Sequence, residues 1–278
     1  PEGTHREKPD VAALAKQILD DKLPEAQRQS LVEKNLALAP ELIVAMTSGM
    51  PNDLKEEYRR IPWIWRVAVH AGKKNDAAIL KRIMDVALPK EGGPLRDWQA
   101  VVIGGGVING IGLVDHWPQE HVAKLIDTPE LKARWLATIN LAHQMADNEK
   151  VHTGTRYDAL RILELDEPEK AIEHLIKYLP KGGNEELQMG AVSGLVDIST
   201  PIGTKLLLGT LSHLTGENRD LAIIGLLRSQ ERASLLFDQI EGGNVPASVF
   251  TEAPKKKLKL LSTGWAQPLQ ERAAKLVP

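Results

Sequence analysis

The stretch LQMGAVSGL, residues 187–195, carries the pattern that decides the fold, with Gln188, Ala191 and Leu195 spaced three and four positions apart. Residues at these spacings share one face of an α-helix, so the alanine and the leucine would both point inward. The small alanine lets a neighbouring helix approach, and the leucine fills the space between the two helices. The stretch therefore predicts a helix that packs against other helices.

The same pattern returns along the C-terminal half of the chain. It occurs as Arg134-Ala137-Leu141, Arg156-Ala159-Leu163, Arg219-Ala222-Leu226 and Gln270-Ala273-Val277. With Ala191 included, successive alanines are 22, 32, 31 and 51 positions apart. Similarity at periods of about 20 to 50 residues is typical of solenoids, because one helical hairpin cannot bury its own apolar face. Intervals of 31 and 32 residues fit one hairpin per repeat.

Partner helices and their ends can be placed between these segments. We expect the second helices of the hairpins around Ala171-Leu175-Leu179, Leu207-Leu211 and Leu235-Ile240. Proline is favoured in the first turn of a helix, so Thr128-Pro129, Glu167-Pro168 and Thr200-Pro201 predict helix starts. Residues 182–184 and 242–244 both read Gly-Gly-Asn, which predicts a left-handed helix end followed by an N-cap.

We therefore predict an all-α fold, an α-solenoid of HEAT or armadillo-like helical hairpins, as a single helical-repeat domain over residues 1–278. An irregular helical N-terminal half, residues 1–117, would precede regular repeats in residues 118–278. Aromatic residues make up only 4 % of the chain, which suits packed helices better than strands. In the N-terminal half we expect helices at 10–20, 25–38, 40–47, 61–71, 76–88 and 95–108.

Composition excludes several kinds of chemistry. The chain has no cysteine, which removes disulfides, thiolate metal sites and covalently attached c-type haem. A formal charge of −2 argues against a dedicated nucleic-acid-binding protein. No apolar run is long enough for a membrane span, and we expect a processed or excised segment because the chain begins at a proline.

Two segments resemble functional sites. The glycine-rich residues 101–113, VVIGGGVINGIGL, lack the spacing of a phosphate loop and predict a helix or turn that another helix approaches closely, with an anion site as the alternative. Arg60, Trp63, Trp65 and Arg66, joined by Trp98 and Trp117, form the candidate partner surface, since Trp and Arg often anchor interfaces. Core packing and a small-ligand pocket remain open as alternatives for the tryptophans.

The histidines predict neither a metal site nor catalysis. His116 and His121, and likewise His143 and His152, lack the i, i+4 spacing that would place two ligands on one helical face. No nucleophile motif accompanies them. We accordingly expect no enzyme activity, no cofactor and no metal.

Five segments carry a family resemblance: IPWIWRVAVHAGKKNDA (61–77), PLRDWQAVVIGGGVINGI (94–111), RWLATINLA (134–142), RYDALRILEL (156–165) and ELQMGAVSGL (186–195). They resemble the HEAT-like repeat segment of large extracytoplasmic proteins of planctomycetes. In that family the segment usually follows a β-propeller described as a membrane-bound dehydrogenase, and it often precedes a haem domain with C-x-x-C-H. This chain contains neither neighbour, and no catalytic residue is known for the repeat segment.

The resemblance implies a non-catalytic scaffold, a spacer or docking segment in an extracytoplasmic, periplasmic redox assembly. Its candidate partners are a β-propeller dehydrogenase or a c-type cytochrome domain. Two alternatives remain open from the residues. One is an enzyme similar to the HEAT-like DNA glycosylases, with Asp97 and Trp98 in a groove. The other is a carbohydrate-binding module that uses exposed tryptophans.

Overall fold

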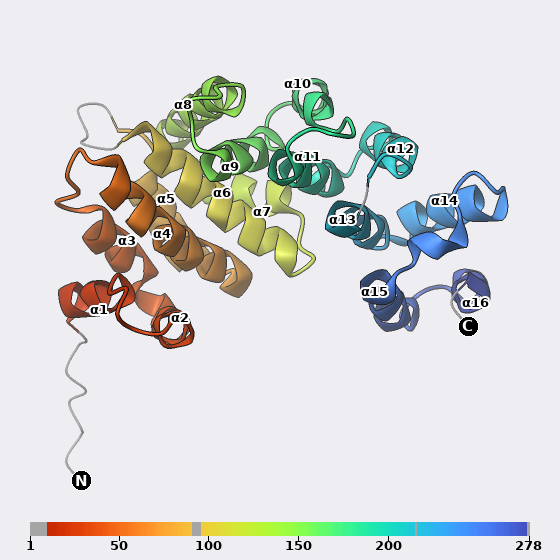
Figure 1. The fold of residues 1–278 in the computed structure, drawn as a ribbon, viewed down its shortest axis with the longest axis horizontal. Helices are drawn as coiled ribbons and strands as arrows, with labels where there is room; N and C mark the ends of the chain where they lie inside the picture. Colours follow the sequence, from red (N-terminus) through yellow and green to blue (C-terminus); the bar gives the residue numbers. More distant parts are fainter. Residues whose placement is uncertain (1–9, 91–95, 215, 277–278) are drawn as a thin grey trace, which may run out of the picture. The chain divides into compact units, whose positions relative to one another are not determined.

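The computed structural model describes residues 10–90, 96–214 and 216–276. Within them the chain forms sixteen α-helices and three short 3-10 turns, and no strand (Figure 1). The prediction of an all-α fold is confirmed. None of the described helices combines the length and apolar character needed to cross a bilayer.

The chain divides into two compact units, residues 1–138 and 139–278. Unit 1 contains seven complete helices: α1 Val11–Ile18, α2 Glu25–Lys34, α3 Ala39–Thr47, α4 Leu54–Lys74, α5 Ala77–Ala87, α6 Asp97–Leu113 and α7 Pro118–Leu125. The boundary falls inside α8, Pro129–Ala146. The prediction of a single repeat domain stays a prediction.

Helices of unit 1 contact the next helix but one. α1 packs on α3, α3 on α5 and α5 on α7, while α2 contacts α4 and α4 contacts α6. The tightest pair is α4 with α6. A Cβ atom added at Gly110 would lie 2.1 Å from the carbonyl oxygen of Val69, and one at Gly72 would lie 2.3 Å from that of Val107. The glycine-rich segment is therefore a buried helix that another helix approaches closely, as predicted.

Unit 2 continues with eight helices: α9 Thr153–Leu163, α10 Pro168–Leu175, α11 Glu185–Asp197, α12 Pro201–Thr210, α13 Gly216–Leu226, α14 Gln230–Glu241, α15 Glu252–Ser262 and α16 Gln267–Leu276. α11 contacts both α9 and α13, and α13 also contacts α15. Among the remaining helices of the unit, α14 contacts α12 and α16. The helix starts predicted at Pro129, Pro168 and Pro201 are all confirmed.

The predicted inward pattern holds in the middle of unit 2. In α9, α11 and α13 the alanines Ala159, Ala191 and Ala222 are 0 % exposed, and so are the leucines Leu163, Leu195 and Leu226. In α16, Ala273 is buried, whereas Val277 lies outside the described residues. These buried alanines and leucines form the helix contacts that hold the unit together.

Two predicted stripes are wrong by about one residue. In α8 the chain buries Trp135 and Ile139, and Ala137 is only half-buried, because the larger apolar side chains take the packed face. In α14 Ile240 is buried as predicted, but Leu236 and Phe237 complete the buried stripe and leave Leu235 41 % exposed. A single heptad-like pattern does not reveal which of two adjacent apolar residues is buried.

Some helix ends also differ from those predicted. α4 begins at Leu54 rather than near residue 61, because Asp53 accepts a hydrogen bond from the Lys55 amide and caps the helix. Pro62 is then an interior residue of α4. Asn184 caps α11, as predicted. Asn244 caps no described helix, although Gly243 before it has the predicted left-handed backbone conformation. Helix α7 was not among the predicted helices.

Candidate partner-binding site

Four of the six predicted partner-surface residues lie on α4. Arg60, Trp63 and Arg66 are three residues apart and share one side of the helix. Trp65 is two positions after Trp63 and points about 200° away around the helix axis. The two tryptophans therefore face different neighbours, and they do not form one aromatic patch.

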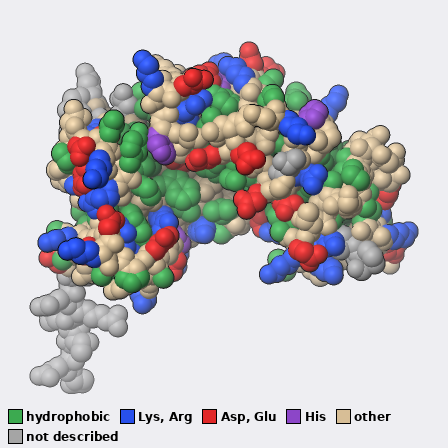
Figure 2. Space-filling model, in the orientation of Figure 1, with side chains coloured by type: hydrophobic (Ala, Val, Ile, Leu, Met, Phe, Trp, Pro, Cys, Tyr) green, Lys and Arg blue, Asp and Glu red, His purple; other side chains and the backbone are tan. Residues whose placement is uncertain are grey.

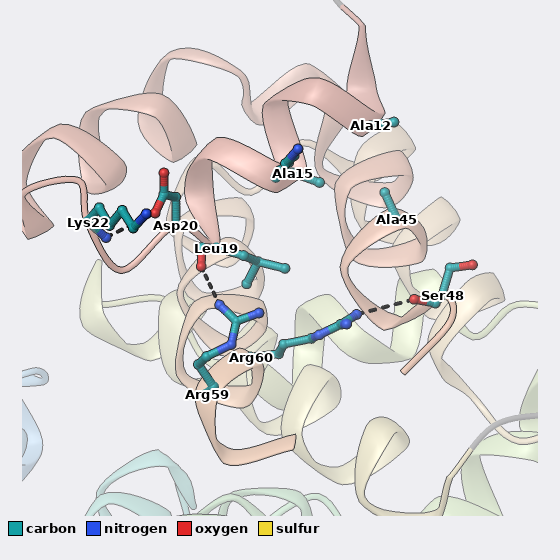
Figure 3. A pocket seen from close by; sticks show the side chains of 10 residues that line it. Ala12, Ala15, Leu19, Asp20, Lys22, Ala45, Ser48, Arg59 and Arg60 are labelled. Atoms are coloured by element: carbon teal, nitrogen blue, oxygen red, sulfur yellow. Dashed lines mark hydrogen bonds between the residues drawn. The ribbon is translucent and has the colours of Figure 1, made fainter. Parts of the chain in front are cut away.

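Arg60 lies at the wall of a cavity of about 690 Å³ between α1, α3 and α4 (Figure 3). Its guanidinium donates to the backbone oxygens of Met46 at 3.1 Å and Ser48 at 3.2 Å. Arg59 donates in the same way to the oxygen of Leu19. These oxygens lie at the C-terminal ends of α3 and α1, where positive charge is stabilising. Arg60 thus has a structural role as a helix cap.

Glu56 holds the two arginines together. It accepts a hydrogen bond at 2.7 Å from Arg59 and another at 2.7 Å from Arg60. These bonds, that of Arg59 first, lower the pKa of Glu56 to about 2. The two arginines beside this cavity are therefore already paired within the chain. This arrangement suits a fixed helix junction better than an anion site.

Trp63 is buried between two arginines. The guanidinium carbon of Arg28 lies 4.0 Å from the centroid of the indole ring, and that of Arg66 lies 4.4 Å from it. Arg28 also donates to the oxygen of Ile18 at 2.6 Å, which ties α2 to the end of α1. Trp63 is only 6 % exposed. Its cation–π contacts contribute about 0.5 to 2 kcal/mol each to packing within unit 1.

Trp65 and Arg66 line a second cavity, of about 630 Å³, which we call the α2–α4–α6 groove. It is lined by Glu25, Ala26, Gln29, Trp65, Arg66, Val69, His70, Lys73 and Leu113. Arg66 pairs with Glu25 at 2.6 Å. Leu113, at the end of α6, is 56 % exposed. The groove thus places an apolar leucine and an indole beside charged side chains.

His70 adds a polar group to the α2–α4–α6 groove. Its Nε2 atom contacts the side-chain amide of Gln29 and lies 3.8 Å from Glu33. Burial, followed by the charge of Lys73, lowers the pKa of His70. Neutral imidazole is therefore favoured in this groove at neutral pH, where it can both donate and accept a hydrogen bond.

Trp98 and Trp117 lie apart from this groove. Trp98 is half-buried in the first turn of α6, and its indole nitrogen is buried with no acceptor among the described residues. Trp117 is half-buried just before α7. Of the six predicted residues, Trp65 and Arg66 line one cavity together. Their role in partner binding stays a prediction.

The alternative functions gain no support from the geometry. All six tryptophans are buried or half-buried, whereas stacking on a sugar needs an open ring face. The side chain of Asp97 lies outside what the structure describes. On the face of each unit shown in Figure 2, the lysines and arginines of the described residues are scattered among acidic residues and form no continuous basic stripe. Such a stripe is the usual footprint of nucleic-acid binding.

Sequence reasoning missed a buried ionic cluster in unit 2. Arg161 on α9 pairs with Glu164 at 2.8 Å and with Asp197 of α11 at 2.6 Å. Asp197 also pairs with Arg228, just after α13, while Arg232 of α14 donates to the oxygen of Val196 at 2.6 Å. All five ionisable side chains are largely buried. A signal was present in the sequence, since Asp197 and Arg228 are 31 residues apart, the spacing of the alanines.

Compared with known proteins, the chain matches no protein-family model and no curated protein. The HEAT-like resemblance therefore stays a prediction.

Proposed function

We propose that the chain is a non-catalytic helical-repeat scaffold, an α-solenoid of HEAT-like hairpins, that binds a protein partner. Support for the repeats comes from helices that contact the next helix but one in both units. In unit 2, polar contacts join residues 31 positions apart: His143 with His174, Asp197 with Arg228 and Asp220 with Thr251. A stack of equivalent hairpins produces such a constant separation.

In unit 1 the corresponding separations are longer. Glu25 with Arg66 and Gln29 with His70 are 41 residues apart, and Asn75 with His121 are 46 apart. Longer and unequal hairpins account for this difference, and they also account for the lack of a detectable repeat in the sequence of this half. HEAT-type repeats of about 40 to 47 residues have this size.

The main support for a binding function is the exposed Leu113, which lies beside Trp65 and Arg66 in the α2–α4–α6 groove. Apolar side chains flanked by Trp and Arg are typical anchors of protein interfaces. Lys73, at the wall of the groove, would attract an acidic group next to an apolar anchor of the partner. The groove therefore suits a partner segment that carries an apolar residue and a carboxylate.

The family resemblance supports the choice of partner. It favours a β-propeller dehydrogenase or a c-type cytochrome domain, in an extracytoplasmic redox assembly where this chain is a spacer or docking segment. A haem protein is convenient to test because the haem absorbs visible light.

The test is retention of purified candidate partners on the immobilised chain, followed by the visible haem band. We expect Leu113→Asp and Trp65→Ala to reduce retention at least tenfold. Leu260→Asp is the matched control, because Leu260 is 68 % exposed on α15, far from this groove in the sequence. Equal retention by the wild type and all three folded variants would rule out this groove as the binding site.

A further inference from the structure

Two histidines of unit 2 face each other between two carboxylates. His143 lies on α8 and His174 on α10, and their Nδ1 atoms are 3.3 Å apart. The Nε2 atom of His143 lies 2.9 Å from Asp166, and the Nε2 atom of His174 lies 3.0 Å from Asp147. The four side chains form one chain of contacts, Asp166–His143–His174–Asp147.

These contacts determine which ring nitrogens carry hydrogen. An ionised carboxylate can only accept, so each Nε2 must donate its hydrogen to the neighbouring aspartate. In a neutral imidazole, the opposite nitrogen then has a bare lone pair. Both Nδ1 atoms are therefore acceptors, and two acceptors at 3.3 Å repel each other unless a cation lies between them.

The spacing of the two Nδ1 atoms fits a metal ion held between them. A proton shared between the two ring nitrogens would form an N–H hydrogen bond, whose length is ordinarily about 2.7 to 3.2 Å. Two nitrogens bound about 2.0 to 2.1 Å from a tetrahedral zinc lie about 3.3 to 3.4 Å apart. The observed 3.3 Å matches the second arrangement.

The surroundings of the two histidines resemble those of metal-binding histidines in proteins. Ligating histidines usually donate their other ring N–H to a carboxylate, which orients the ring. Asp147 is itself held by Tyr178, whose hydroxyl donates to it and also lies 2.8 Å from the backbone oxygen of Ala146. The His174 side chain is 9 % exposed and that of His143 is 33 % exposed, so the pair opens to solvent on the His143 side.

We propose that His143 and His174 bind one divalent transition-metal ion, zinc above all, through their Nδ1 atoms, with Asp166 and Asp147 as positioning residues. Among the described residues no group of three or more His, Cys, Asp or Glu side chains lies close enough together to hold a metal ion. The protein would therefore supply two ligands and leave the remaining positions to water or to a group from a partner. Imidazole nitrogen also suits nickel and copper.

Titration of chelator-treated, untagged protein with zinc, followed by calorimetry, tests this proposal. We expect one equivalent to bind, at least tenfold weaker binding in His143→Gln and His174→Gln, and about 10- to 100-fold weaker binding in Asp166→Asn. His213→Gln is the control, because His213 is exposed in the turn after α12. It should bind zinc as the wild type does.

A second measurement covers the case in which His174→Gln fails to fold, since that side chain is buried. Copper(II) bound to the wild type should show electron-paramagnetic coupling to two nitrogens, and bound to His143→Gln only to one. Zinc binding that is undetectable, or equally strong in wild type and in the His143→Gln variant, would overturn the proposal. So would a wild-type copper spectrum that the His143→Gln substitution leaves unchanged.

Discussion

At the residue scale, Glu164 is an acid buried in the ionic cluster of unit 2. Its side chain is 0 % exposed, and neither carboxylate oxygen accepts a hydrogen bond of good geometry. Burial raises the pKa of Glu164 well above its ordinary value; Arg161 opposes this shift and Asp197 adds to it. Asp197, by contrast, accepts hydrogen bonds from both Arg161 and Arg228. The two acids of one cluster therefore have different roles.

We expect Glu164→Gln to remove a pH dependence of stability. Because the folded state holds a proton that the unfolded state releases above about pH 4.5, this group's contribution to stability falls as pH rises from there toward its folded pKa. The slope is at most about 1.4 kcal/mol per pH unit. Urea unfolding at pH 5 and pH 8 measures this. The free energy of unfolding of Glu164→Gln, relative to that of the wild type, should be higher at pH 8 than at pH 5.

The matched variant Asp197→Asn should behave differently. It leaves Arg161 and Arg228 buried without their carboxylate, which costs about 3 to 5 kcal/mol at both pH values. If instead Glu164→Gln lost as much stability as Asp197→Asn at pH 8, Glu164 would be an ionised partner of Arg161. The assigned protonation would then be wrong.

At the element scale, the contact between α4 and α6 depends on the absence of side chains. We expect Gly110→Ala to destabilise unit 1 by about 3 kcal/mol or more, since the new methyl would lie 2.1 Å from the Val69 oxygen and the backbone must move. Gly209→Ala, on α12, is the control, because nothing lies within 4 Å of its Cβ position. Alanine there should stabilise by about 0.5 to 1 kcal/mol.

Chemical denaturation of both variants measures this difference. Similar small effects in the two variants would show that α6 can move away from α4 at little cost, and that the close approach is not required for the fold.

Much of this element pattern could be predicted from the sequence. Proline and asparagine signals located the starts of α8, α10, α11 and α12, because caps depend on residues adjacent in the chain. Buried faces were harder to predict: Leu235 and Ala137 each have an apolar neighbour that competes for the packed side. For the candidate site, the sequence identified Trp65 and Arg66. It could not separate them from Trp63, whose environment is set by Arg28, 35 positions earlier in the chain.

At the scale of the whole molecule, contacts at a separation of 31 residues predict tolerance of a whole-repeat deletion. Deleting residues 185–215 joins Asn184 to Gly216, and residues Arg219, Ala222 and Leu226 then take the places of Gln188, Ala191 and Leu195. We expect a helical protein that still unfolds cooperatively, because stacked repeats contribute roughly additively. Its stability should fall by at least about 3 to 5 kcal/mol, since Arg228 takes the place of Asp197 and Arg161 loses that carboxylate.

Deleting residues 185–200 alone provides the comparison. It removes α11 but leaves α12 without the helix that precedes it in the hairpin. This variant should lose cooperative unfolding by circular dichroism. If both deletions abolish cooperative unfolding alike, unit 2 is held together by something other than a repeating register.

The burial of α6 has a kinetic consequence. Residues 100–108 are all buried, and glycines bring the α4 backbone against the same helix. Water can reach these amides only when α4 and α6 separate, so their protons should exchange with deuterium at the rate of the largest opening of unit 1. If the amides of this glycine-lined helix take up deuterium last, the helix is the part of the unit that stays folded longest.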